Sequence, residues 1–274
     1  MPKEKVLVSV KTYPTISKKY MEVVCTAGFR KDGSWVRIYP VPFRSMEEFK
    51  QYTKYQWMEL DLEKNYSDPR PESYKVTNID EIKLLETIGT GKTRDWAERR
   101  NLILGKNTIY TNLETLIKKA NENELSLAVF KPSKILNLVV EKVDSREWDA
   151  EKIKELEDRA RQGSLFDKVE RDMQVMPKLP YKFSYKFIDD VGKESTLMIE
   201  DWEIGQLYWA CYEASKNEAD AIAKVKQKYM DEFTQQKDLY LFLGTTRLFH
   251  GRAPNPFVIV GIFYPPLTEQ MPLL

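Results

Sequence analysis

Residues 20–43 read YMEVVCTAGFRKDGSWVRIYPVPF, and this stretch decides the fold of the N-terminal part of the chain. Two runs rich in valine and aromatic residues are separated by KDGS at 31–34, a combination that favours a turn. Similar runs lie on either side, VLVSVKTYP at 6–14 and YQWMELDLEKN at 55–65. Several short strands broken by turns predict a small barrel or a strongly curved sheet.

The rest of the chain alternates between helical and strand-like patterns. Helices are expected around 93–104, 112–124, 205–215 and 218–236, the last with Asn217 as its N-cap. A strand pair is expected within 126–143, a hairpin within 178–205 that turns at Asp190–Lys193, and two closing strands at 238–246 and 256–266. The segment 144–162 is highly charged, with apolar residues near helical spacing, and predicts an amphipathic linker helix.

Together these patterns predict an α+β protein with several parts. In chain order they are a basic, β-rich, barrel-like domain with two helices at 1–143, a charged helical linker at 144–178, a C-terminal domain of a small sheet with helices at 179–266, and an exposed tail at 267–274.

The composition is typical of a folded protein in a reducing compartment. Apolar residues make up 42% and charged residues 31% of the 274 residues. The first residues, MPKEKVLVSVKTYP, lack the apolar core of a signal peptide, and no stretch approaches the roughly 20 apolar residues of a membrane span. Cys25 and Cys211 lie far apart in apolar runs, which predicts buried free thiols. We therefore expect a soluble cytoplasmic protein without a membrane partner.

The first 45 residues combine positive charge with aromatic side chains, although the net charge of the whole chain is only +1. They hold nine lysine and arginine residues against three acidic ones. Basic residues interleaved with aromatics can bind phosphates and stack bases, and DNA is the expected partner. The alternative is a β-rich domain with solvated lysines and core aromatics. The predicted nucleic-acid-binding residues are Lys11, Lys18, Lys19, Arg30, Lys31, Arg37 and Arg44.

His250 is the only histidine in the chain, which excludes His-rich metal sites and phosphodiesterases that use paired histidines. It lies in RLFHGRAPNPF at 247–257, between two apolar strands and close to Arg252. Histidine can act as an acid or base near neutral pH, and arginine can hold a phosphate. His250 and Arg252 are therefore predicted catalytic residues. The alternative is a structural turn in which the histidine caps backbone carbonyls.

Asp201 and Glu203 are a second pair of predicted catalytic residues. On a strand they would face the same side, and paired carboxylates can hold Mg²⁺. The Asp…Glu-x-Lys pattern of many nucleases fails here, because Gly205 stands where the lysine is needed. The alternative is energetically more favourable. In it, Asp201 caps a helix that starts near Gly205, and Glu203 lies in the first turn of that helix. The sequence specifies neither a metal nor a cofactor.

The chain ends on EQMPLL, and this tail resembles the peptides with which bacterial proteins bind the sliding clamp of DNA polymerase, as in MutS-type mismatch-repair proteins. The resemblance implies that glutamine satisfies polar groups at one edge of a groove, which the apolar residues fill. QGSLF at 162–166 is a second match. The alternatives are a disordered or back-packed tail and an internal peptide anchored in the core. The predicted partner-binding residues are Gln270, Met271, Leu273, Leu274, Gln162, Leu165 and Phe166.

Over its whole length the chain resembles bacterial and archaeal proteins without an assigned activity. The stretches that carry this resemblance are SVKTYP, CTAGFRKDGSWVRIYPVPF, LAVFKP, PKLPYKFSYKF and FHGRAPNPFVIVG. The resemblance implies no site residues.

These observations predict a DNA-associated accessory protein in repair, replication-coupled processing or defence, tethered by its tail to a sliding clamp. One alternative is an enzyme that acts on a nucleotide or nucleic-acid phosphate through the His250 loop. The other is a protein-interaction module without nucleic acid.

Overall fold

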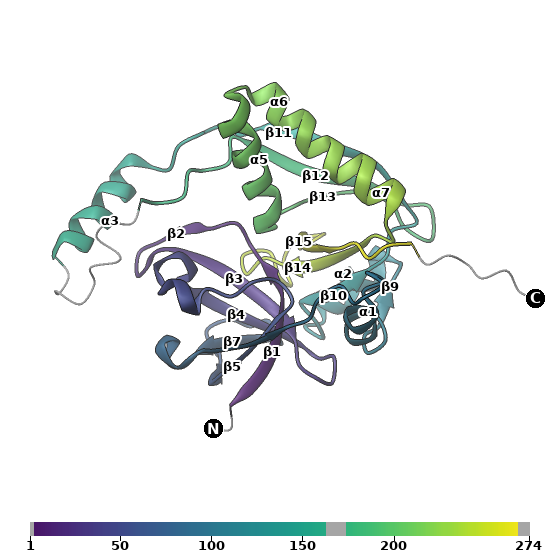
Figure 1. Ribbon diagram of the computed structural model, residues 1–274, viewed down its shortest axis with the longest axis horizontal. Coiled ribbons are helices and arrows are strands. Elements are labelled where there is room, and N and C mark those ends of the chain that lie inside the picture. Colours follow the sequence, from purple (N-terminus) through teal and green to yellow (C-terminus); the bar gives the residue numbers. More distant parts are fainter. Residues whose placement is uncertain (1–2, 163–173, 268–274) are drawn as a thin grey trace, which may run out of the picture.

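The computed structural model describes residues 3–162 and 174–267 and shows an α+β protein built on three β-sheets (Figure 1). The expected β-rich N-terminal part and the C-terminal sheet with helices are both confirmed. Helix α3 (Ala150–Gln162) confirms the helix expected after residue 144, and it projects from the body of the protein (Figure 1). Across these two ranges, no helix has the length and apolar character needed to cross a membrane.

The N-terminal sheet has eight strands and two open edges. Its strands are β1 (Glu4–Lys11), β2 (Thr15–Ser17), β3 (Met21–Phe29), β4 (Trp35–Val41), β5 (Gln56–Leu60), β6 (Leu62–Lys64), β7 (Ser73–Val76) and β8 (Lys83–Thr87). They lie in the order β6-β7-β4-β3-β1-β5-β8, and β2 pairs with β3 outside this path. The edge strands β6 and β8 do not pair with each other, so the strands do not close into a barrel.

The stretch 20–43 forms the centre of this sheet as a pair of antiparallel strands, β3 and β4, with Phe29 opposite Trp35. Strand β1 pairs with the other edge of β3, and Leu7 lies opposite Phe29. Nearly every residue of β3 is buried, because apolar clusters cover both faces of the sheet. One of these clusters includes Phe43 and Tyr52 from the loop that carries the short 3-10 turns η1 (Phe43–Ser45) and η2 (Glu48–Lys50).

Two further sheets come from the rest of the chain. A four-stranded sheet has the order β15-β14-β10-β9 and is formed by β9 (Ile109–Tyr110), β10 (Leu127–Phe130), β14 (Tyr240–Thr245) and β15 (Phe257–Phe263). A three-stranded sheet has the order β11-β12-β13 and is formed by β11 (Lys134–Lys142), β12 (Tyr181–Ile188) and β13 (Glu194–Met198). The expected hairpin turning at Asp190–Lys193 is confirmed as β12 and β13.

The strands expected within 126–143 form, but they belong to different sheets. Lys131 donates its backbone N–H to Tyr110 in the four-stranded sheet, whereas Ser133 donates to Ile188 in the three-stranded sheet. The chain therefore passes from one sheet to the next at Pro132.

The remaining helices are α1 (Ala97–Ile103), α2 (Leu113–Asn121), α5 (Trp202–Ser215), α6 (Glu218–Lys226) and α7 (Phe233–Gln236), with a 3-10 turn η3 (Ile79–Glu81) and a π-helical stretch η4 (Gln227–Glu232). Asn217 caps α6 as expected, because its side chain accepts hydrogen bonds from the backbone of Ala219 and Asp220. The domain boundaries expected at residues 143 and 178 stay a prediction.

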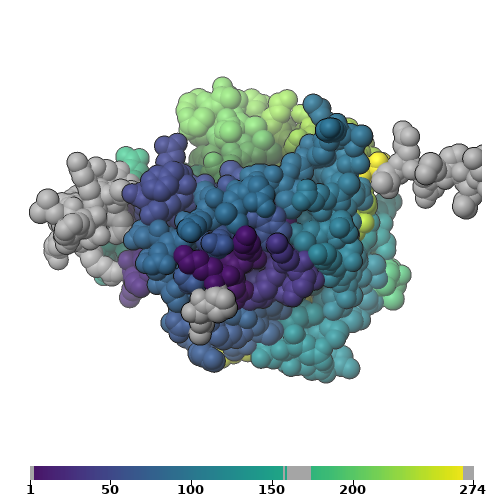
Figure 2. Space-filling view, turned by 60° about the horizontal axis from the view of Figure 1, so that its bottom comes forward, coloured from purple at the N-terminus to yellow at the C-terminus, as the bar shows by residue number. Residues whose placement is uncertain are grey.

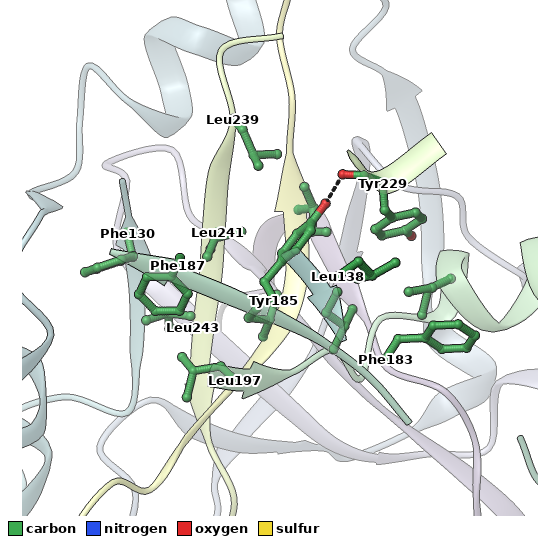
Figure 3. Packing of buried hydrophobic residues seen from close by; sticks show 14 of the residues in the cluster. Phe130, Leu138, Phe183, Tyr185, Phe187, Leu197, Tyr229, Leu239, Leu241 and Leu243 are labelled. Carbon is green, nitrogen blue, oxygen red and sulfur yellow. Dashed lines mark hydrogen bonds between the residues drawn. The ribbon is translucent and has the colours of Figure 1, made fainter. Parts of the chain in front are cut away.

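The C-terminal sheets and helices share one apolar core, shown in Figure 3. Phe183, Tyr185 and Phe187 of β12 are buried in it. The hydroxyl of Tyr185 donates a hydrogen bond of 2.5 Å to the backbone oxygen of Tyr229, which joins β12 to η4.

A second core joins the two halves of the chain. The ring of Phe242 on β14 lies 5.8 Å from that of Phe29 and 5.4 Å from that of Trp35, both on the N-terminal sheet. Figure 2 shows N-terminal strands and the segment near residues 100–130 side by side on one face. Helix α5 also approaches the N-terminal part closely, because a Cβ atom on Gly205 would lie only 2.3 Å from the ring of Tyr13. This approach brings Asp201 and Glu203 to the N-terminal sheet.

Candidate functional site

Three of the predicted nucleic-acid-binding residues are exposed on turns at opposite ends of β3. Lys18 and Lys19 precede the strand, and Lys31 follows it. A strand of nine residues separates these turns by roughly 30 Å. The exposed lysines therefore form two separate positive regions.

Two of the predicted arginines are engaged in ion pairs within the protein. The Arg30 guanidinium pairs with Glu4, and Arg44 Nη1 lies 2.8 Å from a carboxylate oxygen of Glu22. Both side chains are partly exposed, so they could still contact a ligand while keeping these partners.

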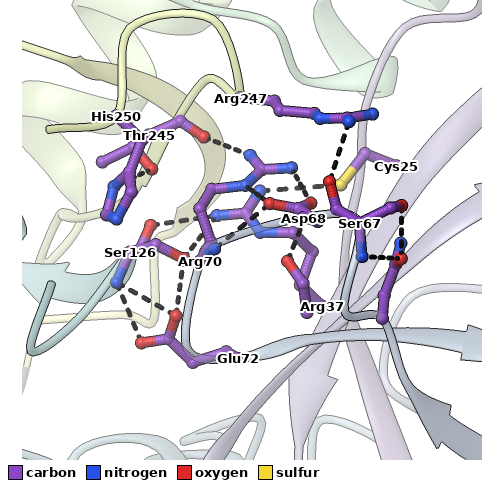
Figure 4. A network of polar contacts seen from close by, with 12 residues as sticks. Cys25, Arg37, Ser67, Asp68, Arg70, Glu72, Ser126, Thr245, Arg247 and His250 are labelled. Carbon is purple, nitrogen blue, oxygen red and sulfur yellow. Dashed lines mark hydrogen bonds and ion pairs between the residues drawn. The ribbon is translucent and has the colours of Figure 1, made fainter. Parts of the chain in front are cut away.

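Arg37 is buried and belongs to a polar cluster that we call the Arg70 network (Figure 4). Its Nη2 atom donates to the backbone oxygen of Ser126 at 2.9 Å, and Nη1 donates to Cys25 Sγ at 3.7 Å. Cys25, like Cys211, is a free cysteine and is half-buried rather than fully buried. The network consists of Arg37, Asp68, Arg70, Glu72, Ser126, Thr245 and His250.

The ion pair between Arg70 and Asp68 lies at the centre of this network. Arg70 donates from Nε and Nη2 to the two carboxylate oxygens, at 2.9 and 2.6 Å, and from Nη1 to the backbone oxygen of Thr245 at 2.6 Å. Burial opposes ionisation of Asp68, but the hydrogen bonds and charge of Arg70 outweigh it and lower the pKa of Asp68 to about 2. The pair therefore links the N-terminal sheet to β14.

His250 is part of the same network, and both of its ring nitrogens have partners. Nδ1 lies 3.0 Å from Thr245 Oγ1, and Nε2 lies 2.8 Å from Asn123 Oδ1. Burial and the nearby Arg70 lower the pKa of His250, which favours the neutral ring. This geometry matches the alternative of a structural turn held by the histidine, although His250 binds side chains instead of backbone carbonyls. Arg252 is exposed in the same loop.

Asp201 and Glu203 lie elsewhere, in a cavity of about 300 Å³ that we call the Lys11 pocket. Asp201 accepts a hydrogen bond from the backbone N–H of Glu203 and is the N-cap of α5, so the helix-capping alternative is confirmed. The residues that line the pocket are Val8, Val10, Lys11, Phe43, Gln51, Tyr52, Thr53, Lys54, Asp201, Trp202 and Glu203.

Lys54 lies between the two carboxylates. Its Nζ atom is 2.9 Å from Glu203 Oε2 and 3.5 Å from Asp201 Oδ2, and it donates to the backbone oxygen of Ile262 at 3.2 Å. Burial would lower the pKa of Lys54, but the two carboxylates outweigh it and raise that pKa above its ordinary value. The Lys54 ammonium thus lies where a metal ion bound by the pair would be expected.

Lys11 lies against the aromatic wall of the pocket. Its Nζ atom is 3.6 Å from the centre of the Phe43 ring and 4.5 Å from that of Trp202, distances typical of cation–π contacts. Burial lowers the pKa of Lys11 to about 8, although Glu203 and Asp201 favour the charged form. Within the described part of the chain, this ammonium has neither an ion pair nor a hydrogen-bond acceptor.

Asp201 is the second incompletely paired group. Its Oδ2 atom is buried and has no hydrogen-bond partner among the described residues, and its only cation contact there is the long one to Lys54. Burial raises the pKa of Asp201 to about 6, against the lowering effect of Lys54. A buried polar atom without a partner is costly, and such atoms gather at functional sites. The pocket therefore combines a free ammonium donor, Lys11, with a buried carboxylate oxygen that lacks a hydrogen-bond partner within the described parts of the chain.

Sequence reasoning found three residues of this pocket, Lys11, Asp201 and Glu203, but placed them in two different sites. It missed Lys54, whose neighbours in the chain carry no motif. Trp202 had a usable signal, because a tryptophan between two acids at a helix start combines an aromatic face with carboxylates.

Apart from the backbone of Gln162, the two predicted clamp-binding peptides lie outside the described residues. The tail residues Gln270, Met271, Leu273 and Leu274 follow the last described position, 267. Gln162 ends helix α3, but its side chain is not described, and Leu165 and Phe166 lie beyond it. Clamp binding therefore stays a prediction.

The fold and the pocket define an α+β protein with a ligand-sized cavity between its N-terminal sheet and helix α5. The chain belongs to the family described as Domain of unknown function (DUF8757), whose model matches residues 106–274. Residues 2–105 match a second model, Domain of unknown function (DUF8758). No curated protein matches the chain.

One similar solved structure is a murine DNA-binding protein bound to double-stranded DNA. The likeness covers 100% of both chains, with 7% sequence identity and a TM-score of 0.31. At this level it indicates neither a shared fold nor a shared function.

Proposed function

We propose that the Lys11 pocket binds the ring of a nucleobase, and that the chain acts on nucleic acid or nucleotides. The observation that carries this proposal is the pair of incompletely satisfied polar groups, Lys11 Nζ and Asp201 Oδ2, at a cavity with aromatic walls. A concave site with aromatic sides, a few polar groups and perturbed pKa values is the usual setting of ligand binding.

The charges of the pocket favour a neutral, planar ligand over a bare phosphate. Lys11 and Lys54 are balanced by Asp201 and Glu203, so the pocket has no net charge to attract an anion. A nucleobase instead offers hydrogen-bond donors and acceptors on its edge and a flat face that packs on aromatic rings. Trp202 supplies such a face beside the carboxylates.

The base could belong to a free nucleotide or to a nucleic-acid strand. The exposed Lys18, Lys19 and Lys31 are the candidate phosphate contacts for a strand. Repair, replication-coupled processing or defence would each use a protein that reads single bases in DNA.

Isothermal titration calorimetry tests this proposal. The four deoxynucleosides, their monophosphates and a short single-stranded oligonucleotide are titrated into the wild-type protein and Glu203→Gln. Glu213→Gln is a matched control at the far, exposed end of α5. We expect binding that weakens at least tenfold in Glu203→Gln and is unchanged in the control. Absence of binding to every probe, or equal binding by all three proteins, would overturn the proposal.

The clamp tether requires its own experiment. A chain that ends at Thr268 lacks the predicted peptide but keeps every described residue that lines the pocket. We expect the full-length protein to bind a purified bacterial sliding clamp and the truncated chain to lose this binding. Equal binding by the two chains would contradict the tail prediction without affecting the pocket.

A further inference from the structure

We propose that Lys11 is a nucleophilic amine that forms a Schiff base with the open-chain aldehyde of a sugar in the Lys11 pocket. This inference rests on the proposed function, since it concerns the same pocket and a ligand that is part of a nucleotide. The sugar could be free or could be a DNA nucleotide that has lost its base, because both expose an aldehyde at the same carbon.

The geometry distinguishes Lys11 from the other lysine of the pocket. Lys54 is held by Glu203, Asp201 and a backbone oxygen, so its lone pair is unavailable. Lys11 contacts only aromatic rings, and its Nζ atom lies at the cavity without an oxygen partner in the described ranges. A lysine desolvated in an apolar pocket is the usual form of an amine nucleophile.

Burial of the Lys11 ammonium outweighs the opposing effects of the charged groups around it. Lys54 disfavours the ammonium, as burial does, whereas Asp201 and Glu203 favour it. The Tyr52 hydroxyl is bonded to Thr26 and burial raises its pKa, so it stays neutral. Because the pKa of Lys11 is about 8, roughly a tenth of the side chains are neutral at pH 7.

The reaction balances with groups that the pocket holds. The nitrogen lone pair of Lys11 attacks the aldehyde carbon, the carbonyl electron pair moves to oxygen, and a proton passes from nitrogen to that oxygen to give a carbinolamine. Protonation of the hydroxyl by a carboxylic acid then releases water as the nitrogen lone pair forms the C=N bond. The candidate acids are Asp201 and Glu203, because both carboxyl groups line the pocket. Amine, aldehyde and the proton of the acid thus give an iminium ion, one water and a carboxylate, and return of the N–H proton to that carboxylate gives the neutral imine, with no oxidant or reductant.

Reductive trapping tests this step directly. The wild-type protein is incubated at pH 7 with sodium cyanoborohydride and either 2-deoxyribose 5-phosphate or an oligonucleotide with one abasic site, and adducts are mapped by peptide mass spectrometry. We expect one adduct at Lys11, at least tenfold less adduct in Lys11→Met, and wild-type levels in Lys118→Met, a matched change on the exposed face of α2. The probe that reacts faster identifies the source of the aldehyde.

Peptide mapping on the wild-type protein keeps the test valid even if Lys11→Met does not fold. Labelling spread over exposed lysines, or no adduct with either probe, would overturn the inference. Nucleobase binding without an adduct would reject the Schiff base alone. An adduct at Lys11 without nucleobase binding would support the Schiff base and reject the proposed function.

Discussion

The Arg70 network and the Lys11 pocket are both clusters of charge enclosed between the two halves of the chain, but they differ in how completely their atoms are paired. In the network, Arg70 places three donors on Asp68 and Thr245, and His250 uses both ring nitrogens. Of the fully buried side-chain nitrogen and oxygen atoms in that network, only Arg37 Nε lacks a partner among the described residues. In the pocket, the Lys11 ammonium contacts only aromatic rings, and the buried Asp201 Oδ2 has no hydrogen-bond partner among the described residues. The network is built to hold the fold, and the pocket to receive a ligand.

The largest effect should come from breaking the network. Arg70→Ala leaves Asp68 buried without its cation, and loss of one partner of a buried ion pair costs about 3 to 5 kcal/mol. Chemical denaturation should show this loss, whereas Arg252→Ala, at an exposed position in the loop that carries His250, should change the free energy of unfolding by less than about 0.5 kcal/mol. Equal effects of the two changes would contradict the role of the network.

The same ion pair has a pH signature. The pKa of Asp68 is about 2 in the folded protein, below its ordinary value of 3.8, so the folded state favours the ionised carboxylate. The resulting stability is present above about pH 4 and is lost as the pH falls toward 2. We expect the acid-induced loss to be smaller in Arg70→Ala than in the wild type, measured by thermal unfolding across this range.

A smaller loss of stability is expected from a change where α5 meets the N-terminal part. Gly205→Ala places a Cβ atom 2.3 Å from the ring of Tyr13, and such overpacking costs about 1 to 3 kcal/mol. The shift of α5 should also weaken ligand binding, because Asp201 and Trp202 begin this helix. Gly89→Ala is the control, since its nearest neighbour would be 4.0 Å away. Unchanged stability and binding in Gly205→Ala would argue against this close approach.

Lys11→Met should stabilise the protein, whereas Arg70→Ala should destabilise it. The pKa of Lys11 is about 8 in the folded state against an ordinary 10.5, so burial of the ammonium disfavours folding below pH 8. This cost shrinks between pH 8 and 10.5 and disappears above. We expect a gain of roughly 1 to 3 kcal/mol at pH 7 that vanishes near pH 10.5, measured by denaturation of both proteins. A loss of stability at pH 7 would show that the ammonium is well compensated.

The smallest effect should come from His250→Gln. Glutamine can replace part of the bonding to Thr245 and Asn123, so we expect a loss of about 1 kcal/mol. Nucleobase binding should be unchanged, since His250 does not line the Lys11 pocket. A selective loss of ligand binding at unchanged stability would instead support the predicted catalytic role of His250.

Local patterns predicted much of the fold but little of the site. The turn at KDGS, the hairpin at Asp190–Lys193 and the cap at Asn217 each depend on a few neighbouring residues, and all three form. The edges of the N-terminal sheet depend on pairing between distant strands, which no local pattern reports. Whether the N-terminal sheet stays open or closes into a barrel could therefore not be predicted from the sequence.

The pocket depends on contacts between distant residues even more than the sheet does. Lys54 and Glu203 are 149 positions apart, and their contact depends on the start of α5 lying beside the segment that precedes β5. Asp201 and Glu203 could be recognised from their spacing, but their partner could not. Lys11 was predicted as a phosphate contact because charge is visible in a sequence, whereas burial against Phe43 and Trp202 is not.

The most direct test of this account is an NMR titration that observes both regions at once. The labelled protein is titrated with a mixture of the four deoxynucleosides while the indole N–H signal of Trp202 and the ring signals of His250 are followed. We predict saturable shifts at Trp202 and unchanged signals at His250. Shifts at His250 with none at Trp202, or no shift at either residue, would contradict the claim that the Lys11 pocket is the functional site.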